Sequence, residues 1–161
     1  MNILTVNLLA NTLIFWIAVR MFLIPRLSEL SPQVVLGPIL LLHATRHLGL
    51  MFLHTGAVYP GMPPSFAYPA AIGDLIAAVL ALAGFLALSR RWAITVVLLW
   101  IFSIVGFVDL INAIALSTIY GADRFMGPAY WIPAFWVPML LVTHVIVLIF
   151  LWRYRSIPIV Q

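Results

Sequence analysis

Five long apolar runs alternate along the chain with short stretches that hold most of its charged residues. Each run has at least the roughly 20 residues that an α-helix needs to cross the hydrocarbon core of a bilayer. The pattern therefore predicts five membrane-spanning helices joined by short loops, in a single domain that covers residues 1–161. We expect these helices at about 2–24, 34–53, 69–89, 92–120 and 129–152.

The composition supports an all-α, polytopic membrane bundle. Hydrophobic residues make up 65% of the chain and charged residues 7%, whereas soluble domains have about 25% charged residues. The formal charge of +4 comes from arginines at helix ends and not from a basic patch, so membrane topology explains it better than nucleic-acid binding. Because the chain has no cysteine, thiolate metal sites and iron–sulfur clusters are excluded.

The arginines also predict an orientation. Five crossings place alternate loops on opposite sides, and one side collects Arg26, Arg90, Arg91, Arg153 and Arg155. The opposite side has only Arg124, next to Asp123. The positive-inside rule then predicts the N-terminus outside and the C-terminus inside, as in a multi-pass protein of a bacterial inner membrane.

An intramembrane cluster of ionisable groups is the main functional candidate. The second apolar run contains His43, Arg46 and His47, which helical spacing places on one face. At about 1.5 Å of rise per residue, Arg46 lies at the same depth as Asp74 and Asp109 of other helices. Since an unpaired arginine in hydrocarbon costs at least a few kcal/mol, we expect Arg46 to pair with one or both carboxylates.

The same layer defines a predicted ligand- or ion-binding set. Its members are Asn11, His43, Arg46, His47, Asp74, Asp109 and Asn112. The alternative interpretation is a structural ion pair that only fixes helix packing. Neither interpretation needs an enzyme, because the sequence shows no recognisable catalytic spacing and no glycine-rich phosphate loop. We therefore favour binding or transport over catalysis.

The histidines leave a second functional hypothesis open. His43 and His47, at positions i and i+4, could reach one metal ion, and His144 lies at a similar depth on another helix. His43 with His144 would suit the two axial ligands of a b-type haem between helices. Alternatively, these histidines are hydrogen-bonded residues of the bundle.

A third hypothesis is a structural accessory subunit of a larger membrane complex, or a homo-oligomer. The small residues of the third predicted helix form a stripe that permits close helix–helix approach. This stripe consists of Ala70, Gly73, Ala77, Ala81 and Gly84.

Two segments of the chain resemble each other. Residues 62–70 and 126–134 share the spacing Met-x-Pro-x-aromatic-x-x-Pro-Ala, each where a loop on the predicted outer side leads into a helix. The similarity predicts that the two loops form a paired rim over one outward-facing cavity. The alternative is that proline and aromatic residues are simply common at membrane interfaces.

Overall fold

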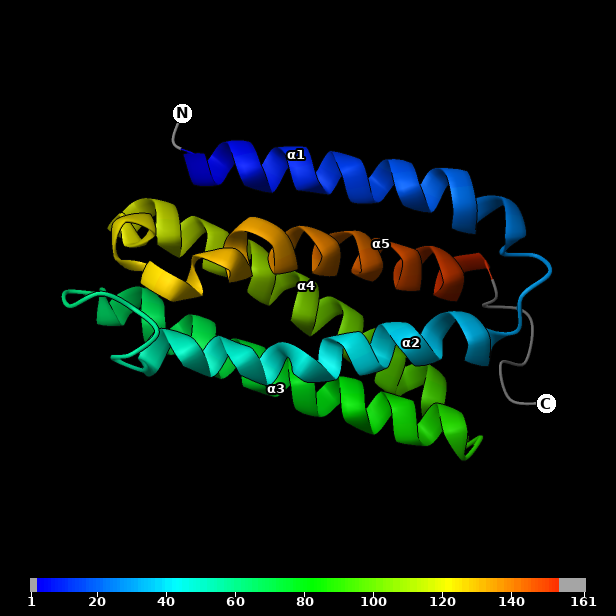
Figure 1. Cartoon of the computed structure of the whole chain (residues 1–161). Helices are drawn as coiled ribbons and strands as arrows, with labels where there is room; N and C mark the ends of the chain where they lie inside the picture. The colour runs from blue at the N-terminus through cyan, green and yellow to red at the C-terminus, as the bar shows by residue number, and fades with distance from the viewer. Residues whose placement is uncertain (1–2, 154–161) are drawn as a thin grey trace.

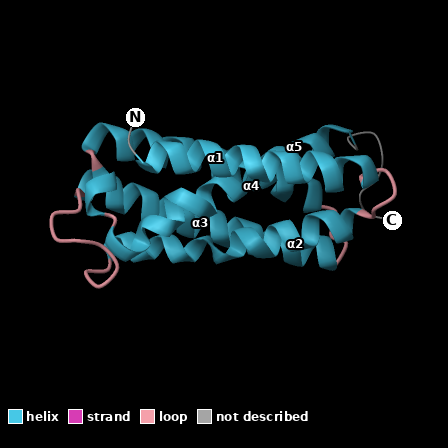
Figure 2. Ribbon diagram, turned by 45° about the horizontal axis from the view of Figure 1, so that its top comes forward, coloured by secondary structure: helices cyan, strands magenta, loops and turns pink. Residues whose placement is uncertain are grey.

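The computed structural model describes residues 3–153, and every long element in that range is helical. Five helical segments are long and apolar enough to cross a membrane, which defines a multi-pass membrane protein. They lie side by side along one axis, and residue 3 and residue 153 are at opposite ends of the bundle (Figure 1). Loops join the helices at both ends (Figure 2).

The main helices are α1 (Ile3–Ala18), α2 (Pro32–Ala44), α3 (Pro64–Ser89), α4 (Thr95–Tyr120) and α5 (Val137–Arg153). Shorter 3₁₀ or π segments extend or join them: η1 (Val19–Leu23), η2 (Ile24–Arg26), η3 (Thr45–Leu53), η4 (Ala122–Phe125), η5 (Gly127–Tyr130) and η6 (Ile132–Trp136). Each expected helix therefore has a counterpart, although the second and the fifth contain turns that are not α-helical.

Several boundaries differ from the expected ones. α3 begins at Pro64 and not near residue 69, because proline suits a first helical turn, where its missing N–H needs no partner. α4 begins at Thr95 and not near residue 92, because a turn precedes it. In this turn the N–H of Trp92 bonds to the carbonyl of Ala87. Residues 2 and 155, used above for the first helix and for the orientation, lie outside the described residues.

α1 is the peripheral helix of the bundle. None of the residues of α1 is buried, and the helix lies along α5 (Figure 1). Asn11 attaches it by donating a hydrogen bond of 2.7 Å to the carbonyl of Ala134 in η6. An α-helical donor to that carbonyl would be residue 138, which is a proline and has no N–H. The side chain of Asn11 thus supplies a hydrogen bond that Pro138 cannot.

α2, α3 and α4 pack closely through the small-residue stripe of α3. Ala70, Ala77, Ala81 and Gly84 of the stripe are buried, as expected for a surface that lets neighbouring helices approach. Apolar side chains then fill the bundle on two sides of a polar layer. One apolar cluster contains Leu40, Leu99 and Phe102, and the other lies nearer the loop before α3.

The two loops at that end of the bundle are joined by their backbones. The N–H of Tyr59 donates to the carbonyl of Phe125 at 2.8 Å, and the N–H of Ala129 donates to the carbonyl of Ala57 at 2.9 Å. Gly127 has a φ of 45°, a conformation that glycine adopts without strain, and a side chain there would lie against Tyr59. The similar segments identified in the sequence thus follow two loops that lie together.

Candidate functional site

Arg46 is the centre of the polar layer and is only 1% exposed. It lies in η3, the 3₁₀ extension of α2, which has about three residues per turn. The buried positions follow that period, because His43, Arg46, Gly49 and Phe52 all face the interior. The change from α to 3₁₀ geometry therefore aims Arg46 at α3 and α4.

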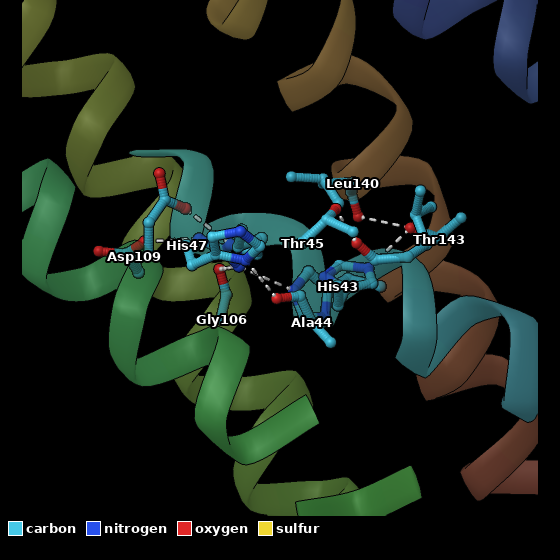
Figure 3. Close-up of polar contacts among 12 residues, drawn as sticks. His43, Ala44, Thr45, His47, Gly106, Asp109, Leu140 and Thr143 are labelled. Carbon is cyan, nitrogen blue, oxygen red and sulfur yellow. Dashed lines mark hydrogen bonds and ion pairs between the residues drawn. The ribbon is translucent and has the colours of Figure 1, made fainter. Parts of the chain in front are cut away.

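The guanidinium of Arg46 binds groups on two neighbouring helices. Its Nε donates to Oδ1 of Asp74 on α3 at 2.7 Å, and its Nη2 donates to Oδ2 of Asp109 on α4 at 2.6 Å. Its Nη1 donates to the backbone carbonyl of Gly106 at 3.1 Å (Figure 3). The expected pairing is confirmed, and it includes both carboxylates. A planar fork of several donors suits this arrangement better than the single point charge of a lysine.

Three glycines make room for these side chains. A Cβ at Gly73 would overlap the carboxylate of Asp109, and one at Gly49 would overlap that of Asp74. A Cβ at Gly106 would lie 2.6 Å from Nε2 of His144 and 3.0 Å from Nη1 of Arg46. Each polar group thus sits where a neighbouring helix has no side chain, so the glycines are part of the site.

His144 on α5 is the third polar neighbour of Arg46. Its Nε2 lies 3.4 Å from Nη1 of Arg46, and its Nδ1 lies 3.4 Å from Oγ of Ser103. A guanidinium has only donors, so we assign Nε2 as an acceptor and place the proton of the neutral ring on Nδ1. His144 therefore adds no positive charge to the cluster.

His43 lies directly behind His144, with the two ring centroids 4.2 Å apart. Thr143 donates its hydroxyl proton to the backbone of α5, at the carbonyl of Met139 or Leu140. Its Oγ1 then accepts a hydrogen bond from the protonated Nε2 of His43, at 2.8 Å (Figure 3). This leaves Nδ1 of His43 unprotonated, and that buried atom has no hydrogen-bond partner among the described residues.

Three residues of the predicted binding set lie elsewhere. His47 is exposed and its ring bonds back to the carbonyl of Ala44 at 3.1 Å. It does not share a face with His43 because, at three residues per turn, the position after Arg46 is turned about 120° away from the cluster. Asn112 is exposed on α4, and Asn11 bonds to Ala134 as described above. The structure therefore does not bring His47, Asn112 and Asn11 together with the cluster around Arg46.

The histidine geometry does not fit a haem or a metal ion. A porphyrin would have to lie between the rings of His43 and His144, which already contact each other. Nε2 of His144 faces the guanidinium of Arg46, which would repel a metal cation. His47 is turned away, and within residues 3–153 no group of three or more metal-binding side chains is arranged around a common point.

A cavity of about 280 Å³ adjoins the cluster, and its wall includes Asp74. It reaches from η4, near the joined loops, to a level roughly 15 Å along α3 from Pro64. Its lining comes from α1, η3, α3, α4, η4, the residue after η4, η6 and α5: Leu4, Thr5, Leu8, Phe52, Phe66, Ala70, Asp74, Leu110, Ala113, Ile114, Ser117, Thr118, Asp123, Met126, Ile132, Pro133 and Val137.

Asp74 is the only residue of the predicted binding set that lines this cavity. The other lining residues were not expected, since most are ordinary apolar residues of separate helices. The one sequence signal was the pair of similar segments, because Phe66 comes from the first and Met126, Ile132 and Pro133 come from the second. Residues of both similar segments thus line one cavity.

The fold and the site together define a class: a multi-pass membrane helical bundle with a buried Arg–Asp–His cluster beside an apolar cavity. Residues 3–152 match the family described as a domain of unknown function, DUF8737, and the chain belongs to that family. Comparisons with curated proteins and with solved structures found no match.

Proposed function

We propose that the protein binds a small molecule in the cavity that contains Asp74, and that it acts in binding or transport. The observation that carries this proposal is a carboxylate held at the wall of a largely apolar cavity. The side chain of Asp74 keeps 13% exposure, whereas that of Arg46 has none. A molecule in the cavity could therefore touch Asp74 but not Arg46.

The rest of the cluster supports this role by positioning Asp74. Oδ1 of Asp74 is bonded to Nε of Arg46, whose other nitrogens are bonded to α4 and to His144. Such a network restrains both the position and the rotamer of the carboxylate before any ligand arrives. Pockets of this kind are largely apolar, with a few placed polar groups that fix the orientation of the ligand.

Filling the cavity tests the proposal. Ala113 lines the cavity, whereas Ala115 on the same helix is exposed on the outer face of α4. We expect Ala113→Leu to abolish binding of a small apolar probe and Ala115→Leu to leave it unchanged. The probes are phenylbutylamine, phenylbutanol and phenylbutyrate, measured by equilibrium dialysis with the protein in phosphatidylcholine nanodiscs.

Empty nanodiscs correct that measurement for partitioning into lipid. Saturable binding of at least one probe, lost only in Ala113→Leu, supports the cavity as the site. If none of the three probes binds saturably, or if Ala113→Leu and Ala115→Leu bind alike, the proposed function is wrong and the cluster is a packing device.

We also propose that the N-terminus is outside and the C-terminus inside a bacterial-type inner membrane. One end of the bundle has Arg26 and Arg153 at the ends of helical segments and Arg90 and Arg91 in a loop, and the loops beside the cavity are at the other end. By the positive-inside rule, the arginine-rich end is cytoplasmic and the cavity is nearer the outer surface. A protease-cleavable tag at each end checks this: in intact cells, only the N-terminal tag should be removed.

A further inference from the structure

We infer that the ligand of this cavity is an organic cation with an apolar body and one protonated amine. This inference rests on the proposed function and specifies the class of molecule that the site accepts. Three observations carry it: the balance of charges in the cluster, the charges in the cavity wall, and the size and polarity of the space.

The cluster has one more negative group than positive groups. Arg46 contributes one positive charge, while Asp74 and Asp109 contribute two negative charges when both are ionised. His144 does not balance the difference, because its Nε2 accepts from the guanidinium and the ring is neutral. A net negative charge within hydrocarbon is costly unless a cation or a proton accompanies it. A cationic ligand at Asp74 would supply the missing charge.

The charged residues of the cavity wall also favour a positively charged ligand. Among the described residues that line the cavity, Asp74 and Asp123 are the ionisable ones, and both are acidic. Asp74 lies on α3 within the membrane, and Asp123 lies in η4 near the joined loops. An anionic ligand would face the carboxylate of Asp74, because the side chain of Arg46 that bonds to it has no exposed surface. Electrostatic attraction therefore favours a cation along the cavity.

The composition of the wall favours an organic cation over a metal ion. Hard cations such as Ca²⁺ need six or more converging oxygen ligands. Besides the two carboxylates, the cavity offers the hydroxyls of Thr5, Ser117 and Thr118, and the remaining side chains are apolar. An apolar body can fill such a space, while a single ammonium group donates hydrogen bonds to a carboxylate.

The volume indicates the size of a molecule that would fill the cavity. A cavity of 150 Å³ in another protein holds one benzene, so the volume of about 280 Å³ suits a ligand of roughly ten to twelve non-hydrogen atoms. Phenylbutylamine lies within this range. Phenylbutanol has the same skeleton with a neutral head, and phenylbutyrate has nearly the same skeleton with an anionic head.

The three probes test the charge preference by equilibrium dialysis in nanodiscs of zwitterionic phosphatidylcholine. We expect phenylbutylamine to bind about tenfold more tightly than phenylbutanol, because hydrogen bonds to a charged partner are stronger than neutral ones. Phenylbutyrate should bind most weakly. Equal affinities for the amine and the alcohol, or a preference for the carboxylate, would overturn the inference while leaving the cavity as a binding site. Equal affinities would indicate that a proton balances the cluster.

Two substitutions connect the preference to the wall of the cavity. Asp74→Asn should reduce the affinity for the amine to that for the alcohol, and Asp123→Asn should reduce it several-fold. Asp123 is outside the cluster, so its variant keeps the test decisive if Asp74→Asn does not fold. Glu29→Gln, at an exposed residue near the other end of the bundle, is the matched control and should retain the tenfold preference. If all three variants keep that preference, these carboxylates do not select the ligand.

Discussion

Replacing Arg46 with methionine should destabilise the protein by about 3–5 kcal/mol, the usual cost of removing one partner from a buried ion pair. Methionine fills a similar volume but leaves Asp74 and Asp109 without their shared partner, at positions where their side chains are only 13% and 12% exposed. The effect is measured as the free energy of unfolding in mixed micelles of a mild detergent and SDS, followed by circular dichroism.

Two comparisons distinguish the effect of breaking the buried cluster from the effect of removing any arginine. Arg20→Met removes an exposed arginine from η1 and should change the stability little. Adding Asp74→Asn and Asp109→Asn to Arg46→Met should recover much of the loss, because uncharged groups replace the orphaned carboxylates. If Arg46→Met is as stable as Arg20→Met, the ion pairs do not hold the bundle together.

The cluster was predictable from the sequence because an arginine buried in hydrocarbon needs an anionic partner, and few are present. Among all 161 residues there are four acidic ones, and only Asp74 and Asp109 fall inside apolar runs. The helical rise then places both at the depth of Arg46. The argument needed no knowledge of packing, which is why it succeeded for these three residues.

The position of His47 was not predictable in the same way. Its expected face depended on continuous α-helical geometry through the second apolar run, whereas the chain tightens to a 3₁₀ helix from Thr45 to Leu53. That segment contains no proline, and Gly49 lowers the α-helix propensity without predicting a 3₁₀ helix. The tightening accompanies the packing of Gly49 against Asp74 on α3, which is a tertiary contact.

The cavity could likewise not be predicted from the positions of single residues in the sequence. Its wall combines residues of α1, η3, α3, α4 and α5 with residues of the short segments between α4 and α5. Which of their apolar side chains leave a gap depends on interhelical distances that no single run determines. Only the similarity of the segments 62–70 and 126–134 pointed to that end of the bundle.

The second large effect is expected at Gly73, where α3 meets Asp109 of α4. Gly73→Ala should cost about 1–3 kcal/mol, as overpacking usually does, because its Cβ would overlap a carboxylate that Arg46 holds in place. Gly84→Ala is the matched control on the same helix. Its Cβ would meet the flexible ends of Leu40, at 3.4 Å, and Leu99, at 3.7 Å, and alanine favours a helix over glycine by roughly 0.5–1 kcal/mol.

A double-mutant cycle shows whether the carboxylate of Asp109 is the cause. If Gly73→Ala acts by displacing that group, then its cost should largely vanish in an Asp109→Ala background, where the overlapping atoms are absent. The same micelle unfolding assay gives all four free energies. Independent, additive effects of the two substitutions would mean that α3 and α4 can separate without disturbing the ion pair. A large coupling would show that the close approach at Gly73 and the bond from Arg46 to Asp109 form one unit.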